Sequence, residues 1–338
     1  MKVQRAAAVL ASVAVIAACS GSGDGPPRGD VGTPGPAATD TGRPPATTPA
    51  PPGTSPTGPV TATYQPPPTF DPEQAMATVQ HLAGEIGPRE ATSPAFHDAA
   101  AWVADQFTAL GYDVEQVDVR VPEGDTSYRP EWGTIVEPGT SANVIADLPG
   151  FDVAEPHVVI GAHLDTVAVA PGAEDNASGI AVLLELARLA AAAPPPVDVR
   201  FIAFGAEEPR GSGDQMHHFG SQQYVRDLPT TDPVTAMVSL DRVGVAASSV
   251  PICTGGTGTT EVRNALLEAA QDAGIAAQPC ENRTSDHWSF EKAQVPAARL
   301  GSVPYGEYHS PNDRPDVVDA TQLERAGAIV WQWLQDAA

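Results

Sequence analysis

Short apolar runs that end abruptly in His or Asp constrain the fold of this chain more than any other feature. Residues 157–163 are mostly apolar and end in His163, with Asp165 two positions later, and residues 236–241 end in Asp241. Such runs are typical of buried strands in a mainly parallel sheet. Polar groups at the carboxyl ends of parallel strands meet along one edge. The pattern therefore predicts a sheet edge that collects functional side chains.

Strand-like and helix-like segments alternate through the second part of the chain. Predicted strands cover residues 112–121, 143–148, 158–162, 199–204, 235–240 and 296–300. Predicted helices cover residues 71–83, with Asp71 as N-cap, and 93–110, 179–192, 221–227, 260–273 and 321–335. This alternation predicts an α/β fold: a mixed, mainly parallel central sheet with helices on both faces.

Composition predicts three parts. Residues 1–18 have a basic start and a short apolar stretch, too short to span a bilayer as a mature helix, which is typical of a signal peptide. Residues 19–68 are crowded with Pro, Gly, Thr and Ser and contain almost no large apolar side chains, so we expect a disordered tether. Residues 69–338 are long enough to bury one large core and form the predicted folded domain.

The three cysteines fit an exported protein. Residues 16–19, Ile-Ala-Ala-Cys, resemble the lipobox of bacterial lipoproteins. This resemblance implies that Cys19 carries lipid on the extracytoplasmic face of the cell membrane, with possible release by proteolysis of the tether; simple secretory cleavage nearby is the alternative. For Cys253 and Cys280 a disulfide is the default in an exported chain. A thiolate zinc site is the weaker alternative, because the two lack a C-x-x-C spacing.

The formal net charge of -24 argues against nucleic acid and anionic lipid as partners. We therefore expect membrane association only through the lipid anchor, and we expect a monomer.

Several motifs occur in one order along residues 70–338. They are G-A-H-L-D at 161–165, P-G-x-x-D-N-x-S-G at 171–179, F-G-A-E-E at 204–208, G-S at 220–221, S-L-D at 239–241, S-D-H at 285–287 and Y-H at 308–309. Together they resemble family 28 of the metallopeptidases, the two-zinc exopeptidases that include secreted bacterial aminopeptidases. The resemblance implies a catalytic domain at 69–338 with the zinc exopeptidase fold.

This resemblance also implies a ligand set for two Zn²⁺ per chain. Asp175 bridges both ions, His163 and Asp241 complete one site, and Glu208 and His309 complete the other. The chemistry is consistent, because two closely spaced divalent ions need a shared anion between them. Three carboxylates leave the pair with one residual positive charge, which a bridging hydroxide, the expected nucleophile, would neutralise.

Three further residues have expected roles beside the ligands. By resemblance Glu207 is the expected general base, which requires an irregular turn if Glu207 and Glu208 are to face one site. Asp165 lies two residues after His163 on the same strand face and is expected to accept a hydrogen bond from the His163 ring and fix its tautomer, with a direct metal ligand as the less favoured alternative. Tyr308 is expected to donate to the substrate carbonyl oxygen, with a packing aromatic as the alternative.

Other polar residues remain less defined. Asp286 and His287 are expected near the pocket, with no catalytic step assigned. Arg299 is expected to be either a structural ion-pair partner or a substrate contact. His217 and His218 are expected in a surface loop, because two adjacent histidines rarely converge on one ion.

The resemblance favours an aminopeptidase acting on peptides. A carboxypeptidase or dipeptidase on the same architecture remains open, and Arg242 beside Asp241 keeps it so, because an arginine could bind a substrate carboxylate. A glutaminyl cyclase, which uses one zinc on this fold, is disfavoured by the complete second ligand pair. A binding module that has lost its ligands is disfavoured because all five ligand positions and Glu207 are present.

The lipobox resemblance generates a prediction about anchoring. Cys19→Ser removes the thiol that would carry the lipid, so the protein should move from the membrane fraction to the medium with its activity unchanged. Cell fractionation followed by an activity assay measures this. Wild-type protein that is wholly soluble from the moment of export, with an unmodified N-terminus downstream of Cys19, contradicts the anchor.

Overall fold

An eight-stranded sheet is the centre of the computed structural model, which describes residues 69–126, 135–231 and 233–337. The strands are β1 (Asp113–Val121), β4 (Gly139–Asp147), β5 (His157–His163), β6 (Asp198–Phe204), β7 (Val234–Asp241), β8 (Val250–Thr254), β9 (Ala277–Glu281) and β10 (Ala297–Gly301). Their order across the sheet is β1-β4-β6-β5-β7-β10-β8-β9. A separate short pair consists of β2 (Gly124–Asp125) and β3 (Ile135–Val136).

Four central strands run in the same direction. β6 pairs parallel with β5, β5 with β7, and β7 with β10. The strands that flank this group, β4 and β8, pair antiparallel with it. The prediction of a mixed, mainly parallel sheet is confirmed, and the carboxyl ends of the four central strands meet at one edge.

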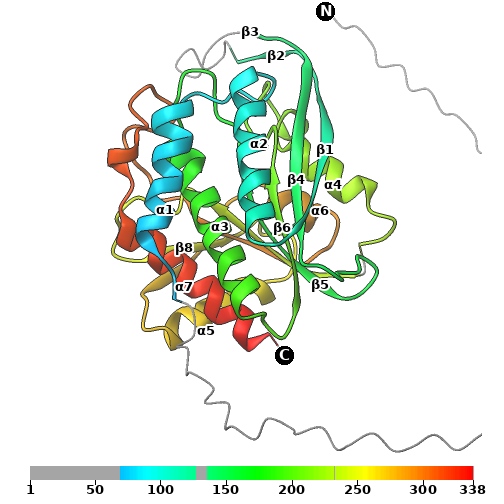
Figure 1. Cartoon of the computed structure of the whole chain (residues 1–338), viewed down its shortest axis with the longest axis vertical. Helices are drawn as coiled ribbons and strands as arrows, with labels where there is room; N and C mark the ends of the chain where they lie inside the picture. The colour runs from blue at the N-terminus through cyan, green and yellow to red at the C-terminus, as the bar shows by residue number, and fades with distance from the viewer. Residues whose placement is uncertain (1–68, 127–134, 232, 338) are drawn as a thin grey trace, which may run out of the picture. The chain divides into compact units, whose positions relative to one another are not determined.

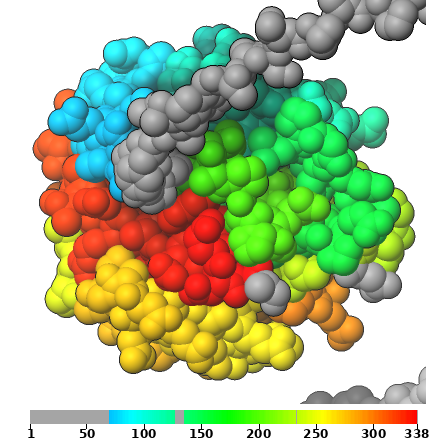
Figure 2. Space-filling view, turned by 60° about the horizontal axis from the view of Figure 1, so that its bottom comes forward, coloured from blue at the N-terminus to red at the C-terminus, as the bar shows by residue number. Residues whose placement is uncertain are grey.

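Helices cover both faces of this sheet, as predicted (Figure 1). One face carries α1 (Pro72–Val79), α2 (Pro94–Ala109), α3 (Ser178–Ala192), α5 (Glu261–Asp272) and α7 (Ala320–Asp336). The other face carries α4 (Phe219–Asp227) and α6 (His287–Lys292). α7 contacts both α3 and α5, and Figure 2 shows its residues (red) between green and yellow segments.

The alternation of side chains along each central strand explains the two covered faces. In β5, Val158 and Ile160 belong to the core beneath α3, while Val159 belongs to the core on the α4 and α6 side. In β6, Phe201 and Ile202 divide in the same way. Successive side chains of a strand point to opposite faces. A strand that is apolar at every position is therefore buried on both sides, and its polar groups can only lie at its ends.

The helix starts also follow local sequence. Asp71 accepts hydrogen bonds from the backbone N–H groups of Glu73 and Gln74, as an N-cap does, and α1 continues to Ile86 as a π-helix. Predicted and observed elements agree closely; the largest difference among the predicted strands is at β4, which begins at Gly139 rather than at residue 143.

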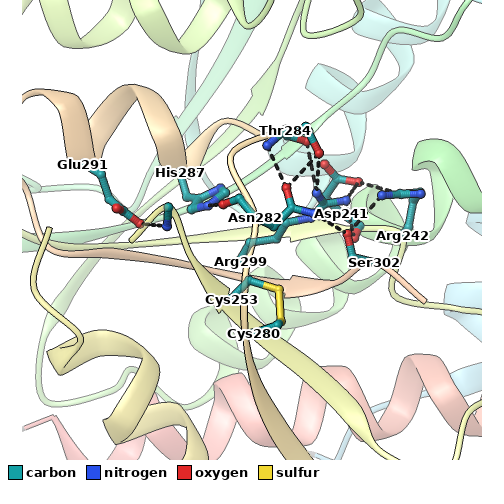
Figure 3. Close-up of a disulfide and its surroundings, with 11 residues drawn as sticks. Asp241, Arg242, Cys253, Cys280, Asn282, Thr284, His287, Glu291, Arg299 and Ser302 are labelled. Carbon is teal, nitrogen blue, oxygen red and sulfur yellow. Dashed lines mark hydrogen bonds and ion pairs between the residues drawn. A yellow bond between two sulfur atoms is a disulfide. The ribbon is translucent and has the colours of Figure 1, made fainter. Parts of the chain in front are cut away.

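The strands β8 and β9, at one side of the sheet, and the short helix α6 were not predicted. β8 and β9 contain Pro251 and Pro279 and are only five residues long, so their sequence signal is weak. The two strands are parallel neighbours in which Cys253 lies opposite Cys280, with their Cα atoms 4.3 Å apart. The predicted disulfide between these cysteines is confirmed (Figure 3).

The predicted signal peptide, Cys19 and the tether lie outside the described residues. Within the described ranges, no helix combines the length and the apolar character needed to cross a membrane.

Candidate metal centre

The predicted ligands converge at the carboxyl edge of the central strands. His163 is the last residue of β5, and Asp241 is the last residue of β7. Glu208 follows β6, and His309 lies in the segment between β10 and α7. All four side chains are buried. Neighbouring parallel strands therefore deliver these groups from four separate parts of the sequence.

Asp175 lies between the two histidines. It belongs to a short π-helical turn, Ala173–Ala177, that leads into α3. Its Oδ1 is 3.1 Å from His163 Nε2, and its Oδ2 is 3.0 Å from His309 Nε2. One carboxylate thus presents a different oxygen to each imidazole, as expected of a carboxylate shared by two ions.

The donor atoms form two groups that share Asp175. One group is His163, Asp175 and Asp241, and the other is Asp175, Glu208 and His309; within each group the ligand atoms lie within 4.8 Å of one another. His163 Nε2 is 3.9 Å from Asp241 Oδ2, and His309 Nε2 is 3.2 Å from Glu208 Oε2. A third group of the same kind joins Glu207 to His163 and Glu208, so Glu207 lies beside the predicted ligands.

The donor set fits zinc, which binds imidazole nitrogen and carboxylate oxygen. Burial raises the pKa of Glu207 to about 8 and the pKa of Glu208 to about 7. Glu208 Oε1 is buried and has no hydrogen-bond partner among the residues that the structure describes. Burial opposes protonation of His309, but the charges of Glu208 and Asp175 outweigh it and raise its pKa to about 10. Buried carboxylates this close together need a compensating cation, and a divalent metal supplies one.

Asp165 orients the segment that follows β6, and one detail of its predicted role is corrected. Its carboxylate accepts hydrogen bonds from the backbone N–H groups of Glu207 (2.9 Å) and Glu208 (3.1 Å). The His163 ring instead has its Nδ1 3.1 Å from the backbone carbonyl oxygen of Asp165, with the carboxylate 3.8 Å away. Asp165 therefore contacts the ring mainly through its backbone, because its side chain is engaged by two amides.

The predicted irregular turn before Glu207 is present. Ala206 has a left-handed backbone, with φ of 55°. A Cβ on Gly205 would lie 2.4 Å from the carbonyl oxygen of Ala142, so only glycine fits there. The turn breaks the alternation of the strand, and Glu207 and Glu208 both line the same pocket.

Asp313 was not predicted, although it holds the loop that carries Asp175. Its Oδ1 accepts the backbone N–H of Glu174 at 2.9 Å. Its Oδ2 accepts the backbone N–H of Asp175 at 3.1 Å and the hydroxyl of Tyr305 at 3.0 Å. In the sequence Asp313 is visible only as an aspartate four positions after His309. The sequence does not show that it is buried or which backbone N–H groups it accepts from.

Arg89 is a second unpredicted support. Its guanidinium is completely buried. It donates to the carbonyl oxygens of Leu164 (3.0 Å), Pro171 (2.6 Å) and Gly172 (3.1 Å). Arg89 therefore ties the end of the His163 segment to the start of the Asp175 loop.

Of the two roles left open for Arg299, the structure shows the ion pair. Its Nη2 donates to Asp241 Oδ1 at 2.7 Å, and its Nη1 donates to the Thr284 carbonyl oxygen at 3.0 Å (Figure 3). Arg242 Nε lies 3.6 Å from the same Asp241 oxygen, and Arg242 Nη2 donates to Ser302 Oγ at 3.0 Å. Both arginines next to the pocket are thus paired within the protein.

Tyr308 lies at the mouth of the pocket. Its ring stacks on His309 with 3.8 Å between ring centroids, and the guanidinium of Arg242 lies 4.5 Å from its centroid. These two contacts orient the phenol beside the predicted ligands, while 37% of the residue stays exposed.

The prediction of a surface-loop location is wrong for His218, whereas His217 is half-buried in that loop. His218 is buried, and its Nε2 lies 3.2 Å from Glu207 Oε1, while His217 lines the pocket. The Gly-rich loop before them folds back on the segment after β6, which composition alone does not indicate. Asp286 and His287 are both fully buried, and burial together with the charge of Glu207 raises the pKa of Asp286 to about 7, which agrees with the expectation that Asp286 lies near the pocket.

A small pocket opens over the two donor groups. Its lining is dominated by carboxylate, imidazole and guanidinium side chains. The lining residues are Asp175, Glu207, Glu208, Pro209, His217, Asp241, Arg242, Thr284, Arg299, Tyr308 and His309.

Comparison with known protein families agrees with this geometry. The model for Peptidase family M28 matches residues 143–334. Aminopeptidase YwaD of Bacillus subtilis is 32% identical over 204 residues, which cover 56% of this chain and 43% of that protein. The uncharacterized protein YfbL of Escherichia coli is 32% identical over 183 residues, which cover 51% of this chain and 50% of that protein. The chain thus matches half or less of the length of these relatives.

Solved structures share the fold. BSAP, a zinc aminopeptidase from Bacillus subtilis, aligns with a TM-score of 0.70 and 21% identity, covering 81% of this chain and 96% of that chain. A Bacteroides thetaiotaomicron glutaminyl cyclase bound to N-acetylhistamine aligns with a TM-score of 0.68 and 21% identity, covering 80% and 99%. At 21% identity the likeness establishes the architecture alone. The same architecture carries an aminopeptidase in one of these proteins and a glutaminyl cyclase in the other.

The contacts of Asp313 generate a prediction about metal affinity. In the wild type both carboxylate oxygens of Asp313 accept hydrogen bonds from the backbone of the Asp175 loop. Asp313→Asn keeps one oxygen as an acceptor, so the Asp175 carboxylate should be held less firmly. Loss of a partner of this kind lowers metal affinity by about 10–100-fold. Competition titration with a zinc chelator measures the affinity, with Asp316→Asn, an exposed aspartate of the same segment, as control. Equal affinities in both variants would contradict the role of Asp313.

Proposed function

The chain belongs to peptidase family M28, and from this premise we propose that it is a two-zinc aminopeptidase, which hydrolyses N-terminal residues from peptides. The observation that carries the proposal is the pair of donor groups sharing Asp175. Two adjacent groups with a common carboxylate fit a two-metal hydrolytic site better than a single structural ion.

In this proposal His163, Asp175 and Asp241 hold one ion, and Asp175, Glu208 and His309 hold the other. Bound zinc would polarise the scissile carbonyl group and make a water molecule a stronger nucleophile. The protein fixes the donors beforehand: Asp313 and Arg89 hold the Asp175 loop, and Arg299 holds Asp241.

Glu207 is the proposed general base. Its carboxylate lies beside both groups but engages neither histidine ligand at ion-pair distance in the described structure. It would accept a proton from the attacking water and pass it to the leaving amine. The two hydrogen bonds from the Glu207 and Glu208 amides to Asp165 fix the backbone from which this side chain extends.

Tyr308 is proposed to donate its hydroxyl to the carbonyl oxygen of the substrate as negative charge develops there. The ring is held between His309 and Arg242, which restricts where the hydroxyl can point. Its partial exposure leaves the phenol accessible to a peptide entering the pocket.

The charges around the pocket favour an α-ammonium over an α-carboxylate as the recognised terminus. Arg299 is buried against Asp241 and Thr284, and Arg242 is paired with Asp241 and Ser302, so neither is held ready for a substrate carboxylate. Glu207 and the second oxygen of Glu208 remain to attract a positive charge. The His163 and Asp241 pair, which supplies a second metal position, favours the peptidase over a glutaminyl cyclase.

The parts before the described residues complete the proposal. Residues 1–18 would direct export, Cys19 would carry lipid, and residues 19–68 would separate the catalytic domain at 69–338 from the membrane. We propose a monomer on the extracytoplasmic face that acts on peptides there.

Metal dependence and the substrate terminus test the function together. Purified protein should contain two zinc ions per chain, lose activity with a chelator and regain it with zinc. It should cleave a free peptide and its C-amidated form but not its N-acetylated form. Cleavage of the N-acetylated and not the C-amidated peptide would identify a carboxypeptidase. Cyclisation of an N-terminal glutamine without hydrolysis would identify a glutaminyl cyclase, and activity in zinc-free protein would exclude the metal mechanism.

Glu207→Gln separates catalysis from metal binding. The substitution removes a proton acceptor and keeps the size of the side chain, so kcat should fall by about 10²–10⁴-fold while the zinc content is retained. Steady-state kinetics and metal analysis measure the two effects. Glu115→Gln, an exposed position on β1, is the control. Near-normal turnover in Glu207→Gln would show that another group is the base.

A further inference from the structure

The loop between Glu208 and α4 closes on itself directly beside Glu207. The backbone N–H of His218 donates to the carbonyl oxygen of Glu207 at 2.9 Å, and the N–H of Phe219 donates to that of Ala206 at 2.8 Å. These two bonds align residues 218–219 with residues 206–207. The side chain of His218 is thereby brought next to the side chain of the proposed base.

The loop is also fixed from α6. Trp288 Nε1 donates to Asp214 Oδ1 at 2.8 Å, and Lys292 Nζ lies 2.9 Å from Asp214 Oδ2. At the start of α4, Ser221 Oγ donates to Ser289 Oγ of α6 at 2.9 Å. Contacts at both ends of residues 214–221 therefore restrict the position of His218.

His218 is held in a backbone conformation that an L-residue adopts rarely. Its φ is 55°, in the left-handed region, and Ala206, opposite it, has the same φ. Glycine would adopt this conformation without steric cost. A histidine at this position is consistent with a requirement for its side chain.

The imidazole of His218 is almost completely buried, and its Nε2 lies 3.2 Å from Glu207 Oε1. Burial lowers the pKa of His218 to about 4, so the ring is neutral at neutral pH and has one N–H to donate. In the described ranges no lysine or arginine lies at ion-pair distance from the Glu207 carboxylate, whose close nitrogen contact is His218 Nε2. His218 is thus the nitrogen donor placed to direct this carboxylate.

We propose that His218 is a positioning residue that donates its Nε2–H to Glu207 Oε1 and so directs the Glu207 carboxylate toward the pocket. The role rests on the proposed function of Glu207 as general base. In this assignment one oxygen of the carboxylate faces the imidazole at 3.2 Å, and the other is left for the proton of the attacking water. His218 itself contacts no reacting atom in this assignment.

Two substitutions of His218 distinguish positioning from packing. His218→Leu removes the donor, and His218→Gln places an amide N–H near the position of Nε2. Misdirection of a catalytic group can cost on the order of 10²-fold in rate. We expect His218→Leu to lower kcat by about that factor with KM and zinc content unchanged, and His218→Gln to restore most of the loss. His97→Leu and His97→Gln, at an exposed position on α2, are the matched controls.

The Glu207→Gln background supplies the second test. If His218 acts through Glu207, adding His218→Leu to Glu207→Gln should cause no further loss of kcat, because the carboxylate that it directs is already gone. Independent losses that multiply would overturn the proposal. So would normal kcat in His218→Leu, loss of zinc from it, or equal defects in the Leu and Gln variants at equal melting temperatures.

An NMR measurement tests the contact between His218 and Glu207 without an activity assay. It therefore still gives an answer if a His218 variant does not fold or if the protein is not a peptidase. In ¹H–¹⁵N NMR spectra of zinc-loaded wild-type protein, His218 should be neutral with its proton on Nε2, and Glu207→Gln should shift that signal. A proton on Nδ1 would overturn the pairing even in an active enzyme. If the wild-type protein has no peptidase activity but the shift is observed, the proposed function fails and the His218–Glu207 contact stands.

Discussion

The rest of the site depends on the burial of Asp175 between two imidazoles. Its two oxygens lie 3.1 Å from His163 and 3.0 Å from His309. A carboxylate is costly to bury unless its charge is compensated and its position is fixed. The surrounding structure addresses both needs: the two histidines lie against its oxygens and would compensate the charge together with the proposed metal ions, while Asp313 and Arg89 hold the backbone of the loop. Residues far apart in the sequence, Arg89 and Asp313, therefore fix the position of the Asp175 side chain.

Unusual backbone conformations are concentrated around this centre. Among the described residues other than glycine, positive φ occurs at Ala206, His218, Arg242 and His309, all of which lie in or beside the pocket segments, and at Gln294 and Ser302. Ala206, Arg242 and Ser302 follow the carboxyl ends of β6, β7 and β10, and His218 directly precedes α4. Such conformations persist where the surroundings over-determine them, and they tend to gather at functional sites. The sheet thus provides a rigid edge that places His163 and Asp241. Turns with unusual backbone conformations orient side chains such as Glu207, which a regular strand would direct elsewhere.

Sequence periodicity was sufficient for the central strands and most helices, because burial on both faces leaves continuous apolar runs such as those of β5 and β6. The ligand set came from ordered motifs, and the structure brings all five positions together. Local patterns could not reveal Asp313 or Arg89, since both act through partners far away in sequence. The contact of His218 with Glu207 depends on how the loop between them folds, which the pattern of residues does not show. β8 and β9 were missed for another reason: they are short, contain proline and depend on β10 and the disulfide for their place in the sheet.

The division of oxygen atoms among partners explains how four neighbouring carboxylates can have different roles. Asp241 gives Oδ1 to Arg299 and turns Oδ2 toward His163, while Asp175 gives one oxygen to each histidine. Glu208 turns Oε2 toward His309. Glu207 alone has its close nitrogen contact with a histidine outside the two donor groups, His218. In the proposed site, the carboxylates directed at the shared histidines would bind the metal ions, whereas Glu207, which faces His218, would stay available for a proton. The difference proposed between the adjacent residues Glu207 and Glu208 thus rests on which imidazole each one faces.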